Sequence, residues 1–87
     1  MIAAINPKML SRQQLRALDI LGAGHRLYRR RGYWGDSPHR VSLDVAGSLQ
    51  GLGLTRIDRT TGPHPFPVLT GAGRDVFAVI EQRRQRA

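Results

Sequence analysis

GLGLTRIDRTTGPHPFPVLTGAGRDVFAVI, residues 51–80, is the stretch that decides the fold of this 87-residue chain. Its runs LTRIDR and FPVLT are rich in strand-forming residues, and TGPHP between them is a turn sequence. The stretch therefore predicts a β-hairpin. Because Pro65 and Pro67 cannot donate ladder hydrogen bonds, we expect this hairpin to be an edge of the structure.

A helix is predicted on each side of the hairpin. In VSLDVAGSLQGLG, residues 41–53, Ser42 is a helix cap and Gly53 ends the helix, with Leu54 placed to fold back in a Schellman stop. After the hairpin, Thr70 caps a last helix in TGAGRDVFAVIEQRR. Their apolar faces are formed by Val45, Ala46, Leu49 and Leu52 in the first helix and by Val76, Phe77, Val79 and Ile80 in the last.

The first helix is predicted in MLSRQQLRALDILGAG, residues 9–24. Ser11 with Gln14 three residues later forms a capping box, which favours a start at Ser11. The alternative start uses Asn6 as the cap and Pro7 as the first helical residue, and the two can combine as a short lead-in turn. The apolar face is Leu15, Leu18 and Leu21, followed by the glycine stop signals Gly22 and Gly24.

Between these helices, HRLYRRRGYWGDSPH spans residues 25–39 and predicts a short strand, bent or paired, and then a polar turn at GDSPH. Tyr33 and Trp34 are expected at the edge of the core rather than as stacking platforms. The sequence leaves open whether residues 26–40 form a strand, a hairpin or a short helix.

A chain of this length predicts one small domain over residues 1–87, with its core in residues 10–84. The absence of cysteine excludes disulfides, thiol catalysis and cysteine-ligated zinc. No apolar run approaches the roughly 20 residues of a membrane span, and MIAAINPK lacks the pattern of a signal peptide. We therefore expect a cytoplasmic protein with no membrane partner.

Positive charge is the strongest feature of the composition, since the net charge is +8. Such an excess favours an anionic partner, nucleic acid above all. Residues 25–40 hold five arginines and one aspartate, a net charge of +4, whereas two arginines and two aspartates balance in residues 41–64. The alternative is the composition of a GC-rich genome, in which arginine is the codon-favoured cation.

Residues that support catalysis do not form a pattern in this sequence. His25, His39 and His64 are far apart and lack the spacing of metal ligands. There is no phosphate-binding loop, nucleophile elbow or acidic cluster. We expect no enzymatic activity, no metal and no cofactor.

The order of three motifs resembles winged helix-turn-helix proteins of the small bacterial, plasmid and phage type. Gly53–Leu54 ends a helix before a hairpin wing, and LTGAGR, residues 69–74, opens the last helix as in the MarR/PadR-like pattern. Upstream, a basic strand with a glycine–aromatic pair precedes the valine–serine start of a helix. The resemblance implies an α+β winged helix of three helices plus a β-hairpin wing. The standard second helix is not visible, so a strand or loop over residues 26–40 is expected in its place.

The resemblance also implies that residues 42–52 enter the major groove of DNA. Gly47 and Gly51 weaken this helix by roughly 1 kcal/mol each relative to alanine. Either the helix packs closely on a neighbour, or its small residues let it approach DNA closely. The expected base contacts are Ser42, Ser48 and Gln50; the expected wing contacts are Arg56, Arg59, Thr61 and His64; the expected phosphate contacts are Arg26, Arg29, Arg30, Arg31 and Arg40.

Together these features predict a transcriptional regulator or accessory factor that binds double-stranded DNA mainly through arginine–phosphate contacts. A homodimer is one expectation, with Phe77 and Ile80 of the last helix at its interface; the alternative is that both pack inside the domain. The alternative function is a protein-interaction module for an acidic partner, favoured by the glycine-rich helix over residues 42–52. RNA binding is a third and weaker alternative.

Overall fold

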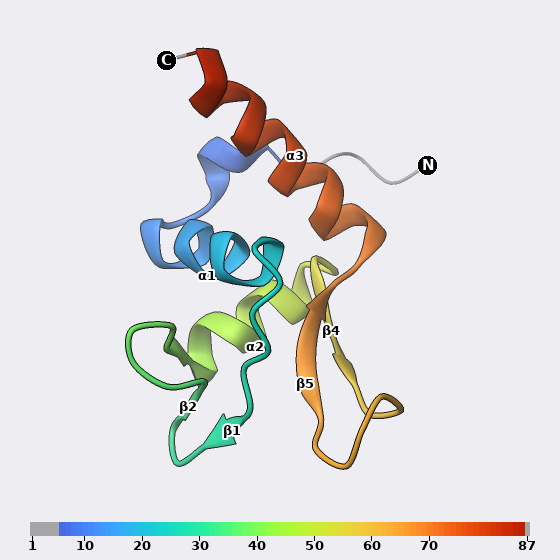
Figure 1. Ribbon diagram of the computed structural model, residues 1–87. Helices are drawn as coiled ribbons and strands as arrows, with labels where there is room; N and C mark the ends of the chain where they lie inside the picture. The colour runs from blue at the N-terminus through green and yellow to red at the C-terminus, as the bar shows by residue number, and fades with distance from the viewer. Residues whose placement is uncertain (1–5, 87) are drawn as a thin grey trace.

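The structure, a computed structural model, describes residues 6–86, which form an α+β fold of three α-helices and two small antiparallel sheets (Figure 1). In chain order the elements are the 3-10 helix η1 (Pro7–Met9), α1 (Arg12–Gly22), β1 (Arg29–Arg30), β2 (Tyr33–Trp34), β3 (Val41–Ser42), α2 (Leu43–Gly51), β4 (Thr55–Asp58), β5 (Phe66–Leu69) and α3 (Gly71–Arg86). The expected fold class is confirmed at this level, and the layout is compatible with a winged helix. Residues 1–5, on which the expectation of no leader depends, lie outside the described part.

Both alternative starts of the first helix are present, one after the other. Asn6 caps η1, with its side-chain oxygen accepting from the amide of Lys8 at 3.0 Å. Ser11 and Gln14 then form the predicted capping box at the start of α1. The helix ends at Gly22, and Gly24 takes a φ of 89°, the left-handed conformation in which a glycine ends a helix.

A three-stranded antiparallel sheet replaces any second helix between α1 and α2. β2 is the middle strand, with Arg30 opposite Tyr33 on one side and Trp34 opposite Val41 on the other. Gly32, with a φ of 85°, lets the chain reverse between β1 and β2. The prediction of a paired strand is confirmed, but the extended run ends at Arg30 because the turn begins there. The predicted turn at GDSPH follows, with a cis peptide bond between Ser37 and Pro38.

α2 begins and ends where its sequence predicts. The hydroxyl of Ser42 accepts from the amide of Val45 at 3.2 Å. At the other end Gly53 has a φ of 77°, and the amide of Leu54 donates to the carbonyl of Leu49 at 3.0 Å. This pair of features is the Schellman stop expected from the sequence.

The second sheet is the predicted hairpin of β4 and β5. Thr55 lies opposite Leu69, and Pro67 lies opposite Ile57. Thr70 caps α3 as expected, because its hydroxyl accepts from the amide of Gly73 at 3.1 Å. The hairpin therefore passes directly into the last helix.

One core joins all three α-helices and both sheets. Its three most completely buried large side chains are Leu18 in α1, Leu49 in α2 and Leu54 after α2. Tyr33 and Trp34 are both half-buried, as expected for residues at the edge of the core, and Trp34 packs against the buried cluster. The buried cluster consists of Leu10, Ala17, Leu18, Ile20, Leu27, Val41, Leu49, Leu54, Val76 and Ile80.

Two glycines in the first turn of α3 provide a matched test of this packing. A Cβ added at Gly73 would lie 2.0 Å from the carbonyl oxygen of Leu54, whereas one added at Gly71 meets nothing within 4 Å. We expect Gly73→Ala to lower the free energy of unfolding by roughly 1–3 kcal/mol, because backbone must shift. Gly71→Ala is expected to leave it equal or raise it by up to about 1 kcal/mol.

Urea unfolding followed by the fluorescence of Trp34, the single tryptophan, measures both variants. Equal effects of the two substitutions would contradict the close approach of α3 to the end of α2.

Candidate nucleic-acid interface

The two hairpins extend toward the same end of the molecule. Figure 1 shows the β1–β2 hairpin and the β4–β5 hairpin at the bottom of the view, with α2 between and above them. η1 and the C-terminal half of α3 lie at the opposite end. The structure therefore brings together three segments in which the sequence places candidate DNA contacts.

Aromatic contacts join the two hairpins. The ring of Tyr28 lies edge-on to the rings of Phe66 and His64, with centroids 6.1 Å apart in both pairs. The guanidinium of Arg26 lies over the Phe66 ring, 4.7 Å from its centroid. The basic segment before β1 is thus held against β5 and the loop before it, and His64 is a neighbour of Tyr28 rather than an isolated side chain.

Two further arginines lie over aromatic rings of β2. Arg40 is 4.3 Å from the centroid of Tyr33, and Arg29 is 6.0 Å from that of Trp34. At exposed sites each such contact contributes about 0.5–1 kcal/mol. The rings carry no charge and so do not neutralise these cations, and Arg29 is also held because its Nη1 donates to the carbonyl of Arg30.

Arg30 differs from its neighbours because it has a carboxylate partner. Its Nε and Nη2 donate to the two carboxylate oxygens of Asp36 at 3.0 and 2.9 Å. The hydrogen bond from Arg30 lowers the pKa of Asp36 below its ordinary value. Within residues 6–86, Arg29, Arg31 and Arg40 form no such ion pair. Of the four arginines at positions 29, 30, 31 and 40, these three therefore carry a positive charge that no carboxylate of the described residues offsets.

Part of the exposed face of α2 has little side-chain bulk. It includes Asp44, Gly47 and Gly51, and a Cβ added at either glycine would meet nothing within 4 Å. This result removes the alternative that the glycines serve packing against a neighbour within the described chain. The helix instead presents exposed backbone at this face.

Two of the three residues expected to contact bases, Ser42 and Ser48, already form hydrogen bonds through their hydroxyls. Ser42 caps α2, and the Ser48 hydroxyl accepts from Nε2 of Gln14 at 3.0 Å while donating to the carbonyl of Val45 at 2.8 Å. Gln50 is exposed and forms no side-chain hydrogen bond to residues 6–86. Of these three residues, Gln50 is therefore the one whose side chain has no hydrogen-bond partner within residues 6–86.

Asp58 organises the turn of the β4–β5 hairpin. Its Oδ1 accepts from the amide of Thr60 at 2.9 Å, the hydroxyl of Thr60 at 3.0 Å and the amide of Thr61 at 3.1 Å. These hydrogen bonds, led by that from the Thr60 amide, lower the pKa of Asp58 to about 2. Arg56 and Arg59 are exposed on either side of this carboxylate.

Sequence reasoning missed Arg16, which fixes the position of Arg40. From α1, Nη1 of Arg16 donates to the carbonyl of Arg40 at 2.7 Å, and Nη2 donates to the carbonyl of Pro38 at 2.6 Å. A hollow of about 300 Å³ opens beside both arginines at the start of α2. The only signal for Arg16 in the sequence is its charge, because no local sequence pattern indicates which distant group a surface arginine of a helix will bind.

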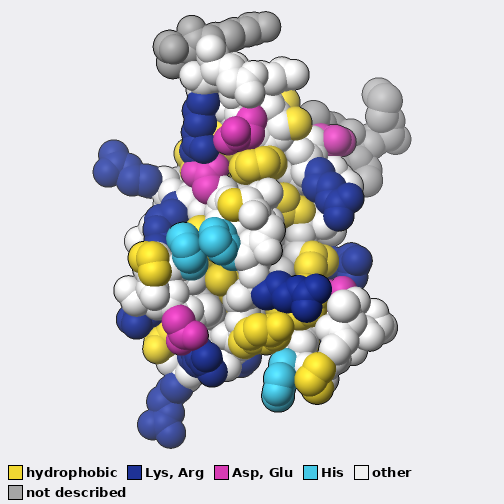
Figure 2. Space-filling view, in the orientation of Figure 1, with side chains coloured by type: hydrophobic (Ala, Val, Ile, Leu, Met, Phe, Trp, Pro, Cys, Tyr) yellow, Lys and Arg dark blue, Asp and Glu magenta, His cyan; other side chains and the backbone are white. Residues whose placement is uncertain are grey.

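The charged side chains do not form a uniform patch. Figure 2 shows basic side chains spread over one face with carboxylates among them and two histidines in contact. Those are His25 and His39, whose rings stack with centroids 4.0 Å apart. In residues 6–86 no group of three His, Cys, Asp or Glu side chains could hold a metal ion, and no helix is long and apolar enough to cross a membrane.

Comparison with models of known protein families, with curated proteins and with solved structures finds no match to this chain. Inferences about function therefore depend on the residues and their arrangement.

The pKa of Asp58 gives a direct test of the hairpin turn. Because the folded-state pKa of Asp58 is lowered, its carboxylate stabilises the turn fully at pH values above the ordinary pKa of 3.8. This stabilisation is lost as the pH falls through about 2. An NMR titration of the Asp58 carboxyl should therefore give a midpoint near 2.

Hydrogen exchange of the Thr60 and Thr61 amides provides the matched comparison. We expect faster exchange in Asp58→Ala and near-native protection in Asp58→Asn, which keeps an accepting oxygen. An ordinary midpoint for Asp58, or identical exchange in both variants, would contradict the turn described above.

Proposed function

We propose that this protein binds double-stranded DNA in the manner of a winged-helix protein, as a transcriptional regulator or accessory factor. The observation that carries the proposal is the placement of arginines without ion pairs on the two hairpins that flank α2. A helix between two basic projections suits a groove with a phosphate backbone on each side. The net charge of +8 adds a general attraction to the duplex.

Phosphate contacts are assigned to the arginines that no carboxylate of the described chain offsets. Arg29 and Arg40 are oriented by the rings beneath them, and Arg31 extends from the turn between β1 and β2. Arg56 and Arg59 act from the other hairpin. Each neutralised phosphate releases counterions, so the affinity falls as salt rises.

α2 is assigned to the major groove, which at about 12 Å wide admits one helix. Gly47 and Gly51 let its backbone approach closely, and Gln50 is the residue suited to an adenine. Asp44 on the same face repels phosphate and tolerates only a donor such as the cytosine amino group. Sequence specificity is therefore expected to be modest beside the electrostatic attraction.

The basis for a homodimer through α3 is weak. Ile80 is buried in the core, and Phe77 lies so close to Gly22 that a Cβ there would be 2.5 Å from its ring. These are the two side chains that the sequence offered to a dimer interface, and both are used within the subunit. We propose that one subunit forms the basic binding unit.

The salt dependence of binding to a random-sequence duplex tests the proposal. We expect the Arg29→Ala/Arg30→Ala/Arg31→Ala variant to bind more weakly than wild type. For each lost phosphate contact, its slope of log affinity against log salt should flatten by roughly 0.9. Fluorescence anisotropy over a salt series gives both quantities.

Two matched variants sharpen this experiment. Lys8→Ala/Arg12→Ala/Arg83→Ala removes the same number of cations from the rest of the surface and should change the slope much less. Asp36→Asn frees Arg30 from its ion pair and should tighten binding. Absence of binding by wild type at low salt, or equal loss in both triple variants, would overturn the DNA proposal and favour an acidic protein partner.

Substitution of the exposed glycines of α2 is expected to change stability and DNA affinity in opposite directions. Glutamine is a better helix former than glycine, so Gly47→Gln/Gly51→Gln should raise the free energy of unfolding by up to about 1 kcal/mol per site. The same variant should bind DNA about tenfold more weakly, because two side chains fill the face that approaches the groove. Ala78→Gln, at an exposed position of α3, is the control for a surface glutamine. Unchanged DNA affinity in the double variant would show that this face of α2 is not at the interface.

A further inference from the structure

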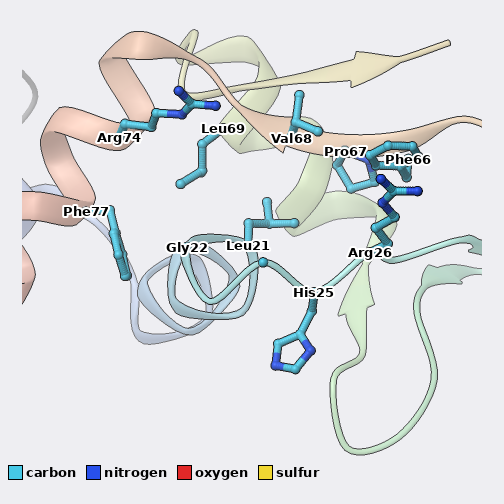
Figure 3. A pocket seen from close by; sticks show the side chains of 11 residues that line it. Leu21, Gly22, His25, Arg26, Phe66, Pro67, Val68, Leu69, Arg74 and Phe77 are labelled. Atoms are coloured by element: carbon cyan, nitrogen blue, oxygen red, sulfur yellow. The ribbon is translucent and has the colours of Figure 1, made fainter. Parts of the chain in front are cut away.

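A groove lies on the side of the domain where α1, β5 and α3 meet. It has a volume of about 400 Å³. Leu21, Val68, Leu69 and Phe77 form its apolar surface, and Arg26 and Arg74 also line it. Figure 3 shows these two arginines toward opposite ends, with β5 residues between them. Figure 2 shows hydrophobic side chains at the surface between basic ones in the middle of this face.

The groove is built by close helix packing rather than by a loose surface. Gly22 has no side chain, which allows the ring of Phe77 to lie against α1; a Cβ at Gly22 would be 2.5 Å from that ring. The close approach of Gly73 to the carbonyl of Leu54 fixes the start of α3 in the same way. The wall that carries Arg74 and Phe77 is therefore held in place from both sides.

The charge at the groove is positive and not offset. The Arg26 guanidinium is held over the Phe66 ring at 4.7 Å, and neither Arg26 nor Arg74 forms an ion pair within residues 6–86. His25 lines the groove, but its ring points away in Figure 3 and stacks on His39. An apolar surface between two free guanidiniums suits an occupant with an apolar body and an anionic group.

We propose that this groove binds a small amphipathic carboxylate, such as an arylalkyl or short-chain fatty acid. Its volume lies in the range of small-molecule sites, about 300–1,000 Å³. A stable protein interface needs about 800 Å² from each partner, far more than one groove between three elements supplies. The carboxylate pairs with Arg74 or Arg26, and the hydrocarbon lies on Leu21, Val68 and Phe77.

Phenylbutyrate is the probe, and phenylbutanol, which has the same body without charge, is the control. Two-dimensional NMR spectra of isotope-labelled protein should show saturable amide shifts in residues 21–26, 66–69 and 71–77 with phenylbutyrate. A ligand of this size is expected to bind with a Kd on the order of 1 mM. Phenylbutanol should bind about tenfold more weakly, because it makes no charge-assisted hydrogen bond.

Arg74→Gln and Arg26→Gln test the two cations separately. At least one of them should weaken phenylbutyrate about tenfold and leave phenylbutanol unchanged. Arg83→Gln removes the same charge from the same helix outside the groove and should have no effect. The proposal is overturned by equal binding of acid and alcohol, by shifts that do not saturate or that lie elsewhere, or by equal effects of all three variants. Because these titrations contain no DNA, neither outcome supports or contradicts the proposal that the protein binds DNA.

Discussion

Leu54 is the point on which the rest of the structure depends, because one residue joins four elements. Its amide ends α2 by donating to Leu49, its carbonyl accepts from Thr70 at 3.0 Å, and its side chain is fully buried. The hydroxyl of Thr70 also donates to the carbonyl of Gly53 at 2.6 Å. The start of β4, the end of β5 and the start of α3 therefore meet at the end of α2, and the hairpin leaves the core from a fixed base.

The elements that could be predicted from sequence are those whose signals are local. The capping box of α1, the serine cap and glycine stop of α2, and Thr70 before α3 each lie within a few residues of the boundary that they determine. The three-stranded sheet could not be predicted in detail, because two-residue strands carry almost no pattern. The chain reverses between β1 and β2 at Gly32, and the segment before β3 is held by hydrogen bonds from Arg16, which lies on a helix that is distant in the sequence.

The candidate site follows the same division. Composition and position locate the arginines in the sequence, but they do not show that Arg30 is paired with Asp36. In the same way, nothing near Ser48 in the sequence indicates that its hydroxyl accepts from Gln14 of α1. The sequence leaves the glycines of α2 as either packing or contact residues, and their surroundings in three dimensions exclude packing within the described chain. The groove beside β5 has no signal in the sequence, because its lining combines residues 21–26 with residues 66–77, two stretches that are far apart in the chain.

The ring of Tyr28 connects the basic segment before β1 to the β4–β5 hairpin. Because this ring lies edge-on to both Phe66 and His64, the basic segment before β1 is packed against the β4–β5 hairpin rather than extending as an independent arm. Under the proposed function, this packing would set the spacing of the two projections before DNA binds, so less conformational entropy would be lost than with two independent arms. Under the same proposal, a duplex whose two phosphate backbones match this spacing would be held at both sides, and a nucleic acid with a different groove width would meet only one projection.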